Sequence, residues 1–371
     1  MMEKKNHREP LFHIVKKDEA TLPVKILTIA VAVLAALLVS ALFINFVTKL
    51  DPISVYQSMF KGAFGSPRRT WITIRDTCLL LLISVSLTPA FRMRFWNCGA
   101  EGQILIGGLS TAALMIYFGN KIPTVVLLVI MFVVSAVCGA LWSLLPALFK
   151  AKYDTNETLF TLIMNYVAIQ IVEFFVDFWD RKQSHSVGII NMDSMGGWFP
   201  KIFGQQYILN VLIVVVITVA VYIYMNYSKR GYEDAVVGES VATARYAGIN
   251  VPKVIRNNVL LSGAIAGIAG FVEVAGISHT ISKETAGGRG FTAIIVCWLA
   301  KFDPFAMILI SAFIVFLDKG ASQISSDFGL NEYASNIITG IILFFILSSE
   351  FFNSYRISVH RNRKEGEQDD H

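Results

Sequence analysis

The stretch ILTIAVAVLAALLVSALFINFV, residues 26–47, decides the class of this protein. It contains no charged residue, and about 20 apolar residues are enough for an α-helix to cross the hydrocarbon core of a bilayer. A cleaved signal peptide has an apolar core of only about 7–15 residues. We therefore expect this segment to be retained as a membrane-spanning helix.

Similar apolar runs recur along the rest of the chain. They cover residues 71–91, 103–118, 123–149, 156–180, 207–227, 257–277, 291–300, 304–317 and 335–349. Of the 371 residues, 54% are hydrophobic and 16% are charged, against roughly 45–50% and about 25% in soluble domains. This composition excludes disordered, collagen-like, coiled-coil and nucleic-acid-binding proteins. It predicts an all-α polytopic membrane protein with about ten transmembrane helices.

One pair of these runs is expected to be short or broken. Residues 291–300 and 304–317 are each too short to cross the membrane as straight, independent helices, and the turn KFDP at 301–304 separates them. Irregular backbone at membrane depth has to be shielded by protein or line a cavity. We therefore expect a tilted or broken hairpin there.

The distribution of lysine and arginine predicts the orientation. With ten spans and a cytoplasmic N-terminus, the inner segments hold 20 of the 32 basic residues and the outer segments hold 11. Such an excess on the inner side follows the positive-inside rule, so both termini are predicted to be cytoplasmic. The expected organisation is a cytoplasmic tail at 1–25, a transmembrane domain at 26–349 with an outer loop at 181–205 and an inner loop at 228–256, and a cytoplasmic tail at 350–371.

Motifs of enzymes that make or break bonds are missing from the sequence. It has no Walker A spacing, no G-x-S-x-G and no H-E-x-x-H. The four cysteines lie in or beside apolar runs without C-x-x-C spacing, and we interpret them as small core residues. We therefore expect no enzymatic activity, no catalytic residue, no cofactor and no metal site.

A polar interruption, NCGAEGQ at residues 97–103, lies between two apolar runs. It is typical of the start of a discontinuous helix, because its two glycines permit unusual backbone angles and the helix dipole favours Glu101 near an N-terminus. Two interpretations are open. The segment forms a polar patch that shapes a pathway or gate, or it is an interfacial cap in which Arg92 or Arg94 holds Glu101.

Two further runs carry patterned polar or small side chains. Thr158, Thr161 and Asn165 recur at three- and four-residue spacing, which places them on one face of a helix. A polar stripe at bilayer depth has to face protein or water, so it indicates either a pathway lining or hydrogen bonds between helices. The small residues of SGAIAGIAG at 262–270 predict a seam where helices pack closely.

The inner loop contains the segment GYEDAVVGESVATARYAGI, residues 231–249. Its acidic residues come early and Arg245 comes late, which suits a short helix or helix pair ended by Gly248. A solvated linker fits poorly, because linkers are usually richer in Ser, Gly and Pro. A surface helix with exposed apolar residues predicts a docking surface for a partner protein.

These segments resemble the integral-membrane permease subunits of ABC importers, in the family that serves ribose, galactosides and nucleosides and is related to the branched-chain amino acid permeases. Residues 97–103 are similar to the family's N-x-G-x-E-G-Q, and residues 156–166 to its N-E…N-Y helix start. Residues 237–249 are similar to its G-x-N-x-x-A-A-R-Y-x-G-I loop, with Ser240 and Thr243 departing from the pattern. A weaker match is GFTAI at 290–294 with the turn that follows it.

Together with the polar patterns, the resemblance implies two groups of site residues. The substrate pathway is expected to involve Asn97, Glu101, Gln103, Thr161 and Asn165. The loop that couples to an ATPase is expected to involve Gly231, Val237, Gly238, Glu239, Ala244, Arg245 and Gly248.

The resemblance also implies partners and a location. The partners are a separate ABC ATPase subunit, an extracellular substrate-binding protein or lipoprotein, and a second permease subunit, either an identical copy or a homologous chain. The expected substrate is a small polar molecule, a nucleoside or a simple sugar. The expected location is the plasma membrane of a prokaryote.

A stand-alone secondary transporter driven by an ion gradient is the alternative. It would need a membrane-buried carboxylate as carrier, for which Glu101, Glu173 and Glu273 are the candidates. Glu173 and Glu273 lie near the expected outer ends of their runs, where water reaches them. The alternative predicts uptake by this chain alone, whereas an importer permease predicts none.

Overall fold

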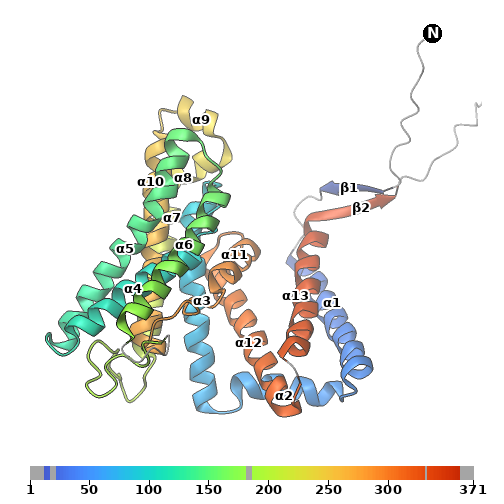
Figure 1. The fold of residues 1–371 in the computed structure, drawn as a ribbon. Helices are drawn as coiled ribbons and strands as arrows, with labels where there is room; N and C mark the ends of the chain where they lie inside the picture. Colours follow the sequence, from blue (N-terminus) through green and yellow to red (C-terminus); the bar gives the residue numbers. More distant parts are fainter. Residues whose placement is uncertain (1–11, 17–21, 181–185, 331, 360–371) are drawn as a thin grey trace, which may run out of the picture. The chain divides into compact units, whose positions relative to one another are not determined.

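The computed structural model describes residues 12–16, 22–180, 186–330 and 332–359. The chain divides into two compact units, one of residues 63–319 and one of residues 1–62 with 320–371 (Figure 1). Most of the predicted N-terminal tail, residues 181–185 of the outer loop and residues 360–371 of the C-terminal tail lie outside the described residues.

The larger unit is a bundle of helices. In chain order these are α3 (Pro67–Arg92), α4 (Ala100–Phe118), α5 (Thr124–Tyr153), α6 (Glu157–Trp179), α7 (Ile208–Tyr227), α8 (Lys229–Glu239), α9 (Val241–Tyr246), α10 (Val251–Glu273) with a π-helical extension η2 (Val274–Ser278), α11 (Arg289–Leu299) and the first part of α12 (Pro304–Phe328). Several begin at side chains that accept a hydrogen bond from the first free amides, a common N-cap. Asn156 caps α6, Ser228 caps α8 and Asn250 caps α10.

The smaller unit contains α1 (Leu22–Phe43) with a π-helical extension η1 (Ile44–Thr48), most of α2 (Pro52–Phe64), the end of α12, and α13 (Glu332–Ser354). Two short strands flank its helices, β1 (Phe12–Lys16) and β2 (Tyr355–Val359). They pair antiparallel with Phe12 opposite Val359. Both strands are rich in aromatic and β-branched residues, which favour extended backbone. The segments expected as tails therefore contribute a small two-stranded sheet.

The helices confirm an all-α membrane protein. Eight of the described helices are long and apolar enough to cross a bilayer, and two shorter apolar helices, Arg289–Leu299 and Asn336–Ile346, add to them. The expected short pair is in fact one short helix, α11, beside a 25-residue helix, α12. The apolar run ends at Leu317, but the helix continues through Asp318 and Lys319, because helical backbone does not require apolar side chains. The orientation of the termini stays a prediction.

The small-residue seam of α10 is confirmed at the centre of the larger unit. A Cβ added to Gly267 would meet the backbone of Ser135 in α5, and one added to Gly107 in α4 would meet the backbone of Gly267. Gly270 approaches Ile104 of α4 in the same way. Without side chains at these positions, α4, α5 and α10 pack backbone against backbone.

Candidate functional site

A buried polar network organises the non-helical segment between α3 and α4. The Asn97 side chain is 0% exposed, and its Nδ2 donates to Ser262 Oγ of α10 at 3.0 Å. Its Oδ1 accepts from the Gly99 amide at 3.0 Å and from Gln103 Nε2 at 3.2 Å. A buried backbone without regular hydrogen bonds needs such partners. Asn97 and Gln103 therefore hold the start of α4 against α10.

The polar stripe of α6 faces the same segment. Thr161 Oγ1 accepts from the Cys98 amide at 3.1 Å. Asn165 Oδ1 accepts from the Gly102 amide at 2.9 Å, and its Nδ2 donates to the Cys98 carbonyl at 2.9 Å. Hydrogen bonding between helices, one of the two interpretations of the stripe, is thus present. A role in lining the pathway stays a prediction.

Glu101 clamps the start of the short helix α11. Its Oε1 accepts from the Gly288 amide at 2.7 Å and its Oε2 from the Gly290 amide at 2.8 Å. The N-terminus of a helix offers free amides and a positive dipole, both of which favour a carboxylate. The proposed cap by Arg92 or Arg94 is wrong, because Glu101 meets backbone amides of α11 instead. All five predicted pathway residues thus lie in one buried cluster that joins α4, α6, α10 and α11.

A charged cluster also lies in the larger unit, and of its members only Glu273 was singled out from the sequence. The Asp76 carboxylate in α3 lies 2.7 Å from Arg75 Nε and 2.6 Å from Lys319 Nζ in α12. Glu273, at the end of α10, lies 3.3 Å from Arg289 of α11. Glu273 was expected to be hydrated, but it is 5% exposed. The sequence feature that indicates this cluster is the Arg75-Asp76 pair inside an apolar run, because charged residues at bilayer depth are usually paired and functional.

The inner loop forms the expected helix pair, α8 and α9. The buried face of α8 consists of Gly231, Asp234, Val237 and Gly238, which recur at helical spacing. A Cβ on Gly231 would meet the carbonyls that end α7, and a Cβ on Gly238 would meet the carbonyl of Arg92 at the end of α3. Two of the predicted coupling residues are therefore glycines because α8 touches the backbone of two long helices.

Asp234 joins α8 to α10 and was missed from the sequence. Asn258 Nδ2 donates to Asp234 Oδ1 at 2.9 Å, and Tyr224 of α7 donates to Asn258 Oδ1 at 2.9 Å. Asp234 is 0% exposed, and burial raises the pKa of its carboxyl to about 8 although the nearby Arg92 charge lowers it. The carboxyl is therefore largely protonated at neutral pH. A single Asp in a mixed-polarity loop carries no signal that it is buried.

The residues of α9 divide into an inner and an outer set. Ala244 is 0% exposed, and its carbonyl accepts from the Ile249 amide at 3.0 Å. Glu239, Arg245 and Gly248 are exposed, as is Tyr246, of which 96% is accessible. Ala244 therefore belongs to the chain's own packing, and the apolar surface available to a partner lies at Val241 and Tyr246 instead.

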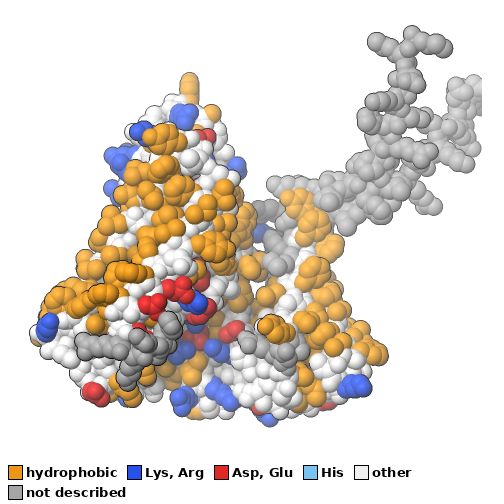
Figure 2. Space-filling model, viewed as in Figure 1, with side chains coloured by type: hydrophobic (Ala, Val, Ile, Leu, Met, Phe, Trp, Pro, Cys, Tyr) orange, Lys and Arg blue, Asp and Glu red, His pale blue; other side chains and the backbone are white. Residues whose placement is uncertain are grey.

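The surface of the larger unit separates charged from hydrophobic side chains. Lys and Arg side chains lie at the end that carries α8 and α9 and also at the opposite end, where Asp and Glu side chains lie among them, whereas hydrophobic side chains cover the helices in between (Figure 2). Charged side chains at both ends of an apolar belt are typical of a bundle that crosses a membrane, and the predicted orientation rests on the count of basic residues in the loops.

Comparison with known proteins gives a family and relatives. Residues 71–347 match the model of the family described as branched-chain amino acid transport system / permease component. A glucose ABC transporter permease protein of Haloferax volcanii is 28% identical, over 91% of this chain and 91% of its own. A guanosine ABC transporter permease protein of Bacillus subtilis is 28% identical, over 86% and 92%, and a nucleoside ABC transporter permease protein of Lactococcus lactis is 24% identical, over 87% and 90%. No solved structure matches this chain.

Proposed function

This chain belongs to the family of branched-chain amino acid transport system permease components, and we propose that it is the membrane-spanning subunit of an ATP-driven importer for a nucleoside or a simple sugar. It is a multi-pass protein of a prokaryotic plasma membrane. The substrate class is supported by relatives named for guanosine, nucleosides and glucose, which match over nearly the whole chain.

The proposed assembly contains three kinds of partner. A separate ATPase docks on the loop at 228–256, an extracellular binding protein delivers substrate to the opposite face, and a second permease subunit, identical or homologous, completes the pathway. The exposed Tyr246 and Val241 beside a basic surface support the first contact, because aromatic side chains tend to dominate protein interfaces.

The packing of α8 is the observation that carries the mechanism. Its buried face touches the backbone ends of α3 and α7 and reaches α10 through Asp234 and Asn258. A displacement of α8 by the closing ATPase therefore acts on three long helices at once. The permease is then a bistable element whose two states are biased by partners at both faces.

We propose that the polar cluster shapes the substrate pathway indirectly, by holding the helices that enclose it. Glu101 links α4 to α11, and Asn165 links α4 to α6, so these side chains set the position of the helices that enclose the pathway. The ion pairs of Asp76 with Lys319 and of Glu273 with Arg289 join α3 to α12 and α10 to α11. We expect these pairs to rearrange when the outer side opens.

Uptake in proteoliposomes tests the proposal. Vesicles with this chain, its second permease, the ATPase and internal ATP should accumulate labelled nucleoside or sugar when the binding protein is outside. Vesicles with this chain alone should accumulate none, with or without a proton or sodium gradient. Gradient-driven uptake by the chain alone would contradict the importer and support a secondary transporter.

A further inference from the structure

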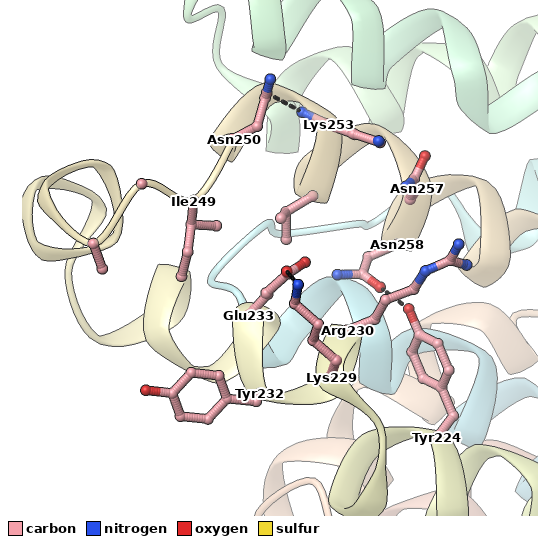
Figure 3. Close-up of a pocket in the computed structure, with 13 residues that line it drawn as sticks. Tyr224, Lys229, Arg230, Tyr232, Glu233, Ile249, Asn250, Lys253, Asn257 and Asn258 are labelled. Atoms are coloured by element: carbon pink, nitrogen blue, oxygen red, sulfur yellow. Dashed lines mark hydrogen bonds and ion pairs between the residues drawn. The ribbon is translucent and has the colours of Figure 1, made fainter.

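A basic cleft opens between the end of α7, α8, the turn at 247–250 and the start of α10 (Figure 3). Its volume is about 640 Å³, and its floor contains the Tyr224 hydroxyl and the Asn258 amide, which are hydrogen-bonded to each other (Figure 3). Lys229, Arg230 and Lys253 also line it, against one acid, Glu233. Glu233 lies 3.9 Å from Lys229, and within the described part of the chain neither Arg230 nor Lys253 forms an ion pair. The cleft therefore carries an excess of positive charge.

An apolar groove continues from this cleft along the bundle. It has a volume of about 370 Å³ and is lined on α7 by Ile217, Ala220 and Val221 and on α10 by Leu261 and Ile265. The cleft and the groove share Tyr224, Arg230 and Asn257. From Lys253 to Ile265 the lining follows α10 for about 18 Å at 1.5 Å per residue.

We propose that the cleft and groove together bind one anionic phospholipid, with its phosphate in the cleft and an acyl chain in the groove. The cleft offers two ammonium groups and a guanidinium to a phosphate. The groove lies in the predicted membrane-spanning part of α7 and α10, where acyl chains are the solvent. The predicted cytoplasmic position of α8 places the headgroup in the leaflet that carries anionic lipids.

The continuity of the two cavities favours a lipid over other occupants. A free phosphate or another small anion would use the basic cleft and leave the apolar groove without a role. A docking protein that meets α8 and α9 also reaches the cleft, because the turn at 247–250 lines it. Such a protein does not occupy the groove, which runs away from that end between two membrane helices. A lipid is the ligand whose polar and apolar ends match both parts.

Lipid binding to the full purified chain tests the proposal independently of transport. In mixed micelles, phosphatidylglycerol should raise the thermal unfolding midpoint and stay bound in native mass spectra, whereas phosphatidylcholine and inorganic phosphate should do neither. The double variant Arg230→Gln/Lys253→Gln should bind phosphatidylglycerol roughly 25-fold more weakly, since each basic residue near a headgroup contributes about five-fold. Ala220→Phe should fill the groove and also weaken binding without a change of charge.

Two matched variants serve as controls. Arg256→Gln removes an exposed charge from the same helix outside the cleft, and Val219→Phe adds an aromatic ring beside the groove; both should bind as the wild type does. The proposal is overturned by equal binding of both lipids, by an equal effect of phosphate, or by an equal loss in the controls. It is also overturned if the double variant keeps its lipid and loses the ATPase, since the cleft would then be a protein-docking site.

Discussion

At the scale of single residues, polar side chains accept hydrogen bonds from backbone amides that have no helical partner where a helix is interrupted. Asn97, Asn165 and Glu101 each bond to backbone amides that a continuous helix would have satisfied itself. Leaving a buried polar group unpaired costs about 1–3 kcal/mol. The polar residues of the N-x-G-x-E-G-Q pattern are therefore needed for folding, and they are also candidates for the lining of the pathway.

The Glu101 clamp gives the first prediction. Glu101→Ala leaves the Gly288 and Gly290 amides without their acceptor, so it should destabilise the fold by about 2–6 kcal/mol for two unpaired groups and abolish transport. Glu101→Gln keeps one acceptor and should have an intermediate effect. Thermal unfolding and reconstituted uptake measure both, with the exposed Glu284→Gln as a control that should behave as wild type. An unchanged unfolding midpoint in Glu101→Ala would mean that the clamp does not hold α11.

The buried Asp234 gives a prediction about pH. Its folded pKa, about 8, lies above the ordinary value of 3.8, so the folded state binds this proton more tightly than the unfolded state. This contribution to stability is fully present below pH 4 and is lost progressively as pH rises toward 8. The Arg92 charge of α3 opposes this rise in the pKa of Asp234. Tyr224 of α7, which bonds to the same Asn258 side chain, lies near the Asp234, Arg230 and Glu233 charges.

Asp234→Asn removes the titrating group and keeps a side chain of the same shape. We expect its unfolding midpoint to fall less than that of the wild type between pH 6 and 9, and to exceed it at pH 9. Thermal unfolding across this pH range is the measurement, and Asp193→Asn on the exposed outer loop is the control. Parallel curves for the wild type and Asp234→Asn would show that Asp234 is ionised throughout.

At the scale of elements, the proposed coupling function is divided between α8 and α9. The buried face of α8 binds the ends of the membrane helices, whereas α9 presents its aromatic side chain outward. The short α11 depends on Glu101 from another helix for its start, as a helix of 11 residues is marginal by itself. The positions of these short helices are therefore set by the longer helices that they contact.

Removal of the exposed aromatic on α9 gives a prediction at this scale. Tyr246→Ala should weaken retention of the ATPase by about 2 kcal/mol or more, the loss typical of an interface hot spot, and should leave thermal stability unchanged. Co-purification and substrate-stimulated ATP hydrolysis measure the effect. Phe203→Ala, which removes a 94% exposed ring from the outer loop, is the matched control. Normal ATPase retention by Tyr246→Ala would place the docking surface elsewhere.

At the scale of the whole molecule, the charge distribution predicts a direction across the membrane. The count of 20 basic residues in the inner segments and 11 in the outer ones places the loop with α8 and α9 inside and the loop with Ser194 outside. In a chain whose four cysteines are replaced by alanine, a cysteine at Ala242 should react with an impermeant thiol reagent only from inside. A cysteine at Ser194 should react only from outside. The opposite pattern of labelling would reverse the predicted topology.

Much of this protein follows from its sequence alone, because bilayer thickness and the cost of burying charge act on every span independently of the others. These constraints predicted the all-α class and the ten apolar segments, and the ordered motifs at 97–103, 156–166 and 237–249 indicated the permease family. The seam of α10 was also readable, since small residues at four-residue spacing permit close packing whatever the partner helix is.

Tertiary structure alone decided what each polar residue touches. That Glu101 meets the amides of Gly288 and Gly290, that Asp234 is buried against Asn258, and that Ala244 faces inward all depend on helices far apart in the chain. A sequence pattern specifies which face of a helix is polar, because helical geometry is local. It does not specify the neighbour of that face, because the neighbour is chosen by the packing of the entire bundle.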